Sequence, residues 1–223
     1  MDYGELTRIL SLNGMNINIP ITKIDDFLKY PDYVRELALN CEYNEPGYNL
    51  YPGSVSKNII LNIDKDLNRW ITEKISLLFY GLTIINITCD FHKILPYKEH
   101  DHIRNKGLIH KDIGTNITAV VYLNKDPSIN SGTSFYKTIK NHDYLQSNEY
   151  LNAICNYHNG KEVSDLDNLL KDHYNKFKQI DCIQNKYNQM SIYPADIWHA
   201  PTTYGKVPRY TLRFFINYDM EKG

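Results

Sequence analysis

The order of apolar patterns along the chain predicts an α+β fold, with helices first and antiparallel strands second. Two segments before residue 81 repeat apolar residues at helical spacing, whereas most segments after Thr83 alternate with a period of two. A polar, Asn-rich stretch, residues 138–186, interrupts the strands. This order favours a double sheet of jelly-roll type, supported by the N-terminal helices and interrupted by one helical insert.

The composition is that of one globular domain, which we expect to span residues 1–223. The formal net charge of −1 offers no broad basic field for a phosphate backbone, so we expect no nucleic-acid partner. The first residues lack the pattern of a signal peptide, and no apolar run approaches the ~20 residues of a membrane span. We therefore expect a cytoplasmic protein without a membrane partner. The sequence does not indicate an oligomeric state.

The four cysteines are widely spaced and form no C-x-x-C pair. This spacing argues against a structural zinc site and favours free thiols. The four residues are Cys41, Cys89, Cys155 and Cys182.

The first elements are a strand and two helices. Residues 16–24 alternate apolar and polar side chains, as in a strand. Pro31 is a favourable first helical residue, and apolar residues follow it at helical spacing. In the second helix Asp64 can act as the N-cap and Gly81 ends the pattern.

The strand that begins at Thr83 has two different faces. One predicted face is apolar and consists of Ile85, Ile87, Cys89 and Phe91. The other is polar and consists of Asn86, Thr88, Asp90 and His92. A strand with one polar face borders either solvent or a functional site.

The remaining elements are mostly short strands. A helix is expected over residues 165–180, where Ser164 and Asp167 form a capping-box pattern. The predicted strands are 117–123, 133–137, 189–194, 197–200 and 209–219.

His110 and Asp112 immediately precede the strand predicted over residues 117–123. Two histidines and one carboxylate on one side of an iron ion leave three coordination positions open, as in non-haem Fe(II) oxygenases. His199, on a short distant strand, is a suitable third ligand. Arg209 follows ten residues later and opens the last apolar strand, where it could hold the far carboxylate of a dicarboxylate cosubstrate.

With these residues in place, the chain resembles the Fe(II)/2-oxoglutarate-dependent dioxygenases. The segments "AVVYLNKDPSINSGTSFY" and "WHAPTTYGKVPRYTLRFFINYD" are similar to the metal and cosubstrate segments of the prolyl-hydroxylase-like branch. The segment "ITKIDDFLKYPDYVRELALN" is similar to its opening strand and helix. The chain looks closer still to an uncharacterised bacterial and viral subgroup. The resemblance implies a double-stranded β-helix, or cupin-like jelly roll.

The resemblance also implies roles for individual residues. The three metal ligands at the catalytic centre would be His110, Asp112 and His199. Arg209 would bind the C5 carboxylate of 2-oxoglutarate, and Thr211 would face inward beside it because residues i and i+2 of a strand share a face. The other cosubstrate contacts that the resemblance implies are Tyr122 and Tyr97.

Several assignments stay open at this point. Arg213 shares a face with Arg209 and could anchor the dicarboxylate instead, or contact the substrate. His100 and His102 could contact substrate at the mouth of the site, or form a rival metal cluster with His92. The stretch 138–186 could be a lid over the site or a surface insertion.

The implied activity is hydroxylation of an amino-acid, peptidyl or small-molecule substrate. Fe(II), 2-oxoglutarate and O2 would be required, and succinate and CO2 would be released. One alternative is a cupin-like metal-binding or sensing module without turnover, which would not need Arg209 or Tyr122. Another is a nucleic-acid demethylase on the same scaffold, which would need a basic groove and aromatic residues that stack on bases.

Overall fold

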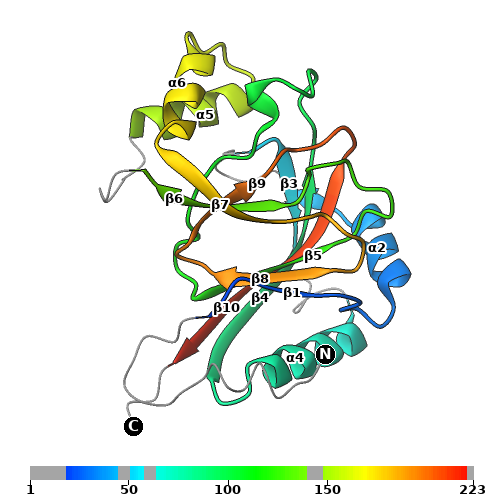
Figure 1. Cartoon of the computed structure of the whole chain (residues 1–223). Coiled ribbons are helices and arrows are strands. Elements are labelled where there is room, and N and C mark those ends of the chain that lie inside the picture. Colours follow the sequence, from blue (N-terminus) through cyan, green and yellow to red (C-terminus); the bar gives the residue numbers. More distant parts are fainter. Residues whose placement is uncertain (1–18, 45–50, 58–63, 140–147, 220–223) are drawn as a thin grey trace.

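The computed structural model describes residues 19–44, 51–57, 64–139 and 148–219, and the statements below concern those residues. The fold is α+β, as predicted, with two antiparallel sheets (Figure 1). The seven-stranded sheet has the order β1-β8-β5-β10-β4-β3-β2, and the three-stranded sheet has the order β7-β6-β9. Strands that are distant in sequence therefore lie side by side.

The elements have the following bounds. The large sheet contains β1 (Thr22–Ile24), β2 (Tyr43–Asn44), β3 (Gly53–Ser56), β4 (Thr83–Ile94), β5 (Ile117–Tyr122), β8 (Met190–Pro194) and β10 (Arg209–Asp219). The small sheet contains β6 (Thr133–Thr138), β7 (Phe177–Ile183) and β9 (Trp198–Pro201). The helices are α2 (Pro31–Asn40), α4 (Lys65–Leu78), α5 (Asn148–His158), α6 (Leu166–Tyr174) and the 3-10 turn η1 (Ile103–Asn105).

Both predicted N-terminal helices are present. Helix α2 begins at Pro31, and the Asp64 carboxylate caps α4 by accepting hydrogen bonds from the backbone N–H groups of Asp66 and Leu67. Gly81 follows α4 with a φ of +94°, a conformation that favours glycine. The local signals at these ends are strong enough to set the helix boundaries.

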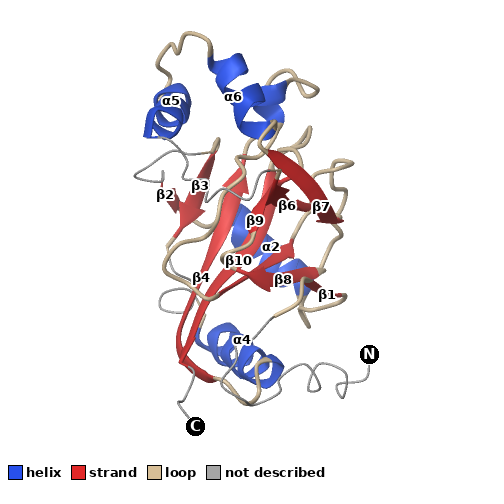
Figure 2. Ribbon diagram, turned by 60° about the vertical axis from the view of Figure 1, so that its left-hand side comes forward, coloured by secondary structure: helices blue, strands red, loops and turns tan. Residues whose placement is uncertain are grey.

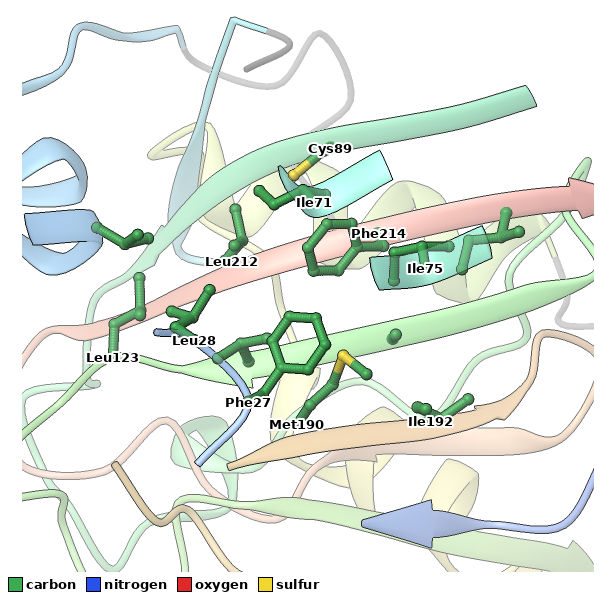
Figure 3. Close-up of a cluster of buried hydrophobic side chains, with 14 of the residues drawn as sticks. Phe27, Leu28, Ile71, Ile75, Cys89, Leu123, Met190, Ile192, Leu212 and Phe214 are labelled. Atoms are coloured by element: carbon green, nitrogen blue, oxygen red, sulfur yellow. The ribbon is translucent and has the colours of Figure 1, made fainter. Parts of the chain in front are cut away.

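One face of the large sheet packs against α2 and α4 and forms the main core (Figure 3). Ile71 and Ile75 of α4 are fully buried there, with Cys89 of β4 and Phe214 of β10. Burial of this apolar area is the main favourable contribution to folding. Because the helices cover only one face of the large sheet, the side chains on the opposite face of the same strands can form a site.

That opposite face is covered by the small sheet. Tyr122 of β5 and Tyr193 of β8 pack there against Phe135 of β6 and Ile183 of β7. The strand alternation sends the polar side chains of β4, β5 and β10 into the space between the sheets. These strands have one face in the apolar core and the other towards the space between the sheets, which explains why apolar and polar residues alternate along them.

Two strand predictions need correction. The strand expected over residues 16–24 is limited to Thr22–Ile24 among the described residues, and residues 16–18 lie outside them. Ile85 is 65% exposed instead of sharing the buried face of Cys89. The β4–β10 register shifts between Asn217 and Tyr218, and this bulge breaks the alternation at Ile85.

The helix predicted over residues 165–180 is wrong at its C-terminal end. It stops at Tyr174, and Phe177–Ile183 pairs with β6 as a strand. The predicted capping box is also absent, because Asp165 occupies the N-cap in a left-handed conformation and its side chain makes no capping hydrogen bond to the helix backbone. Asp167 instead accepts a hydrogen bond from Arg104 at 2.6 Å.

Helices α5 and α6 lie at one end of the sheets, beside the small sheet (Figure 2). Helix α5 was not predicted from the sequence. The pair packs on the segment before His110, with Leu108 in one apolar cluster with Tyr150, Leu166 and Leu170. All four cysteines are free thiols, as predicted. Over the described part of the chain, every helix is too short or too polar to cross a bilayer.

Candidate metal centre and its cavity

Three candidate ligands meet at the edge between the two sheets. The ligand atoms of His110, Asp112 and His199 all lie within 4.8 Å of one another. Backbone hydrogen bonds fix their positions, since His110 and His199 exchange two N–H···O bonds of 2.9 Å and the Asp112 N–H donates to Ala195 O at 2.9 Å. The segment that carries the first two ligands is therefore tied to the strand that carries the third.

Both histidines are oriented by backbone carbonyl groups. His110 Nδ1 lies 2.8 Å from Leu108 O, and His199 Nδ1 lies 2.9 Å from Ile197 O. Because a carbonyl oxygen can only accept, we assign the Nδ1 proton to both rings. Each Nε2 then faces the centre, in the orientation that metal-binding histidines commonly adopt.

The Asp112 carboxylate lies between the two rings and is ionised. His110 Nε2 is 3.5 Å from Oδ1, His199 Nε2 is 3.3 Å from Oδ2, and Thr118 Oγ1 donates to Oδ2 at 2.6 Å. Burial would raise the pKa of Asp112, but in the absence of metal its interactions with the two histidines, when these carry a second proton on Nε2, hold it far below its usual range. Two imidazoles and one carboxylate form a donor set that suits Fe(II), with coordination positions left open.

A cavity of about 210 Å³ opens beside the three side chains. Polar side chains from β4, β5, β9 and β10 point into it, together with apolar groups from both sheets. The lining residues are Tyr51, His92, Ile94, Leu108, His110, Asp112, Thr118, Val120, Thr133, Tyr193, His199, Pro201, Tyr204, Arg209, Thr211 and Arg213.

Arg209 is a buried cation with one donor left over. Its side chain is 5% exposed, and its Nε has no hydrogen-bond partner in the described part of the protein. The guanidinium carbon lies 5.4 Å from the centre of the Tyr122 ring, whose hydroxyl contacts Thr133 Oγ1 at 2.8 Å. Thr211 is buried beside it, as expected. A buried cation of this kind is costly unless an anion binds to it.

Arg213 differs from Arg209 because it already has an acidic partner. Its Nε and one terminal nitrogen lie 3.3 and 3.4 Å from the two carboxylate oxygens of Asp90. Its guanidinium also lies 4.2 Å from the centre of the Phe215 ring. Of the two arginines, Arg209 is the one whose charge lacks compensation, which favours it as the dicarboxylate anchor.

The cavity is also lined by Tyr51 and by His92, which the sequence offered only as part of a rival metal cluster. His92 Nε2 lies 3.3 Å from Asp90 Oδ1, and the His92 ring stacks on Tyr51 at 5.5 Å. Burial, and then the charge of Arg213, lower the pKa of His92 to about 4, so it is neutral at pH 7. The alternation of β4 predicted that His92 lies on the polar face of the strand. Which side chains surround it depends on the strand register, which the sequence does not specify.

The structure does not bring Tyr97, His100 or His102 into this cavity. Asn105 holds their loop by accepting from the Tyr97 N–H and donating to His100 O. His102 Nε2 lies 3.4 Å from Asp167, and its ring lies 5.5 Å from that of Tyr97. These residues tie the loop to α6 instead. The rival metal cluster with His92 is therefore not formed among the described residues.

This two-sheet α+β fold is shared with solved structures of two prolyl hydroxylases and of HygX. A Pseudomonas putida prolyl-4-hydroxylase aligns with a TM-score of 0.51 and 15% identity, over 90% of this chain and 93% of that one. A prolyl hydroxylase from Trichoplax adhaerens, in complex with a peptide fragment of a hypoxia-inducible factor, aligns with a TM-score of 0.52 and 13% identity, over 88% and 83%. HygX from Streptomyces hygroscopicus, with nickel and 2-oxoglutarate bound, aligns with a TM-score of 0.54 and 10% identity, over 88% and 82%.

At these identities the likeness shows a common fold. Within that fold class, the chain belongs to a family of unknown function, DUF6445, whose profile matches residues 10–206. A comparison with curated proteins finds no match.

Proposed function

We propose that the chain is an Fe(II)- and 2-oxoglutarate-dependent oxygenase that hydroxylates an amino-acid, peptidyl or small-molecule substrate. One observation carries this proposal: the His110–Asp112–His199 group and the uncompensated Arg209 border the same cavity. A metal-binding module without turnover would use the first feature and leave the second unexplained. The fold supports the proposal, since HygX binds nickel and 2-oxoglutarate.

His110, Asp112 and His199 would hold the iron. Arg209 would bind the C5 carboxylate of 2-oxoglutarate, with Thr211 beside it and Tyr122 beneath it. When bound, iron, 2-oxoglutarate and O2 supply the oxidation of a C–H bond, with release of succinate and CO2.

The other residues of the cavity would orient the metal ligands and exclude water from the reacting groups. The Thr118 hydroxyl fixes one Asp112 oxygen, and the paired backbone of the two histidines holds their separation. Apolar lining from Ile94 and Val120 limits the water around the reacting groups. We further propose that residues 1–223 form one catalytic domain.

The first test is anaerobic visible absorption of the metal-free protein titrated with Fe(II) and then with 2-oxoglutarate. We expect a weak charge-transfer band that needs both additions. His199→Ala should abolish the band, and Arg209→Ala should require far more 2-oxoglutarate, because the C5 carboxylate loses its partner. His158→Ala, on α5 away from the cavity lining, serves as the matched histidine control.

The outcomes separate the alternatives. Binding of Fe(II) with no response to 2-oxoglutarate would favour the cupin-like module. Binding of neither would overturn the proposed function. Succinate release would then serve to search for substrates, and a nucleic-acid substrate is disfavoured by the formal net charge of −1.

A further inference from the structure

Two arginines of β10 border the cavity but lean towards different sides of their strand. They are four residues apart on one face, which separates their backbones by about 13 Å. Arg209 lies over Tyr122 of β5, whereas Arg213 is bound to Asp90 of β4. β5 and β4 flank β10 on opposite sides. One small dicarboxylate that reaches the metal and Arg209 therefore leaves Arg213 for another ligand.

We propose that Arg213 binds a carboxylate of the substrate, so that the substrate class is a small carboxylic acid. This inference rests on the proposed function and specifies which molecule shares the cavity with 2-oxoglutarate.

The guanidinium of Arg213 is held in place before any ligand arrives. Asp90 contacts its Nε and one terminal nitrogen, and Phe215 lies against its flat side. The second terminal nitrogen makes no contact with Asp90, and the side chain keeps 22% of its exposure. A guanidinium with a fixed plane and a free edge is suited to a carboxylate, because little side-chain entropy remains to be lost.

The strand register places Arg213 next to the candidate metal centre. Arg213 pairs with Val120 of β5, and Thr118 lies two residues from Val120 on the same face. The Thr118 hydroxyl in turn contacts Asp112. A small molecule bound to Arg213 would therefore have its carbon atoms close to the metal ligands, as a substrate must.

The charges around Arg213 favour a single carboxylate over a phosphate. Asp90 lies behind Arg213 and offsets part of its charge, which leaves too little for a dianion. The neighbouring His92 is neutral at pH 7, because burial lowers its pKa to about 4. Among the residues that line the cavity, the permanent cations are Arg209 and Arg213. A substrate phosphate would need a second cation on the β4 side.

The test measures ligand binding to protein saturated with Ni(II) and 2-oxoglutarate, so that no turnover occurs. The probes are L-α-amino acids, 2-hydroxy acids and unsubstituted short carboxylic acids, each compared with its carboxamide by titration calorimetry. We expect at least one acid to bind about tenfold or more tighter than its amide, as for a hydrogen bond to a charged group. Arg213→Gln combined with Asp90→Asn should bring that ratio close to one.

The double variant removes the ion pair without leaving a buried, unpaired carboxylate, so it should remain folded. Arg104→Gln combined with Asp167→Asn is the matched control, because it removes a half-buried Arg–Asp pair outside this cavity. The control should keep the wild-type preference for the acid.

Two results would overturn the inference. One is that no acid binds better than its amide to the wild-type protein. The other is that the Arg213 variant weakens 2-oxoglutarate binding as strongly as Arg209→Gln does, which would assign Arg213 to the cosubstrate. If 2-oxoglutarate does not bind at all, the proposed function fails, and the acid–amide comparison with Ni(II) alone still decides the role of Arg213.

Discussion

The Thr118 hydroxyl holds the carboxylate of the candidate metal centre through a 2.6 Å hydrogen bond to Asp112. Thr118→Val keeps the shape of the side chain but removes this donor. We expect metal affinity to fall about 10- to 100-fold, the usual effect of losing a group that orients a ligand. Competition with a chelator of known affinity measures it. Thr118→Ser retains the hydroxyl and should bind metal within a few-fold of wild type, whereas equal affinity in the valine variant would contradict this role.

The two cavity arginines should respond to neutralisation in opposite ways. Arg209→Met removes a buried, uncompensated cation, so we expect the free energy of unfolding of the ligand-free protein to rise by about 1 kcal/mol. Arg213→Met leaves Asp90 without its charged partner and should lower the free energy of unfolding by roughly 2–4 kcal/mol. Urea denaturation without metal measures both, and a loss of stability in Arg209→Met would argue that Arg209 is already compensated.

At the level of single residues, sequence reasoning finds side chains whose chemistry and spacing are both distinctive. His110, Asp112 and His199 are brought together as expected, and Arg209 opens the strand on which it was predicted. Thr118 was not assigned a role, and His92 was named only as part of a rival metal cluster, because their positions depend on which residue of a neighbouring strand lies opposite. Tyr97 was placed at the site by the resemblance, and His100 and His102 by their loop near its mouth. Hydrogen bonds to Asn105 and the contact of His102 with Asp167 hold that loop elsewhere.

At the level of elements, the segment before His110 packs unusually close to β9. A Cβ atom on Gly107 would lie 2.4 Å from Pro201 O, so Gly107→Ala must push the two segments apart. Because these segments carry His110 and His199, we expect both metal affinity and the melting temperature to fall. Gly160→Ala is the control, since its φ of +76° makes alanine strained without any clash. It should lower stability by about 1 kcal/mol and leave metal affinity unchanged.

The elements that sequence reasoning identified carry strong local signals, such as Pro31 at the start of α2 and Asp64 at the cap of α4. The error in residues 177–183 has a tertiary cause. Phe177 continues the helical apolar pattern of α6, but pairing with β6 makes this stretch a strand. Ile85 is comparable, because a bulge defined by the partner strand decides its exposure. Propensity cannot report contacts that are distant in sequence.

Helix α6 carries a buried histidine that should make its packing sensitive to acid. His173 is 1% exposed and stacks on Tyr150 at 4.3 Å. Burial, and then the charge of Lys176, lower its pKa to about 4. The folded state therefore disfavours protonated His173. The share of the free energy of unfolding that depends on neutral His173 is fully present above pH 6.5 and is lost as the pH falls towards 4. It amounts to up to about 3 kcal/mol.

His173→Phe keeps the aromatic stack but cannot be protonated. We expect its free energy of unfolding to depend less on pH between 6.5 and 4 than that of the wild type. Tyr174, which also contacts His173, stays uncharged over this range because burial raises its pKa. Parallel urea titrations across this range measure the difference. Identical pH slopes for the two proteins would show that His173 does not titrate in this way.

At the scale of the whole molecule, the candidate site joins parts that are otherwise held by separate clusters. His199 belongs to the small sheet, Arg209 belongs to the large sheet, and His110 and Asp112 lie on the segment between η1 and β5. A bound metal would therefore link the small sheet to this segment, and 2-oxoglutarate would extend the link to the large sheet. Ligand binding should then stabilise the entire fold rather than one element.

The corresponding prediction is a single unfolding transition that shifts as a unit. With metal at about 100 times its dissociation constant, the free energy of unfolding should rise by about 2.7 kcal/mol. For a chain of this size that raises the melting temperature by roughly 5–10 °C. Adding 2-oxoglutarate should raise the melting temperature further in the wild type but not in Arg209→Met. Calorimetry could instead resolve two unfolding transitions, one of them insensitive to metal. Because a cooperative unit cannot be stabilised in part, that result would contradict both the link between the sheets and the proposal of one domain.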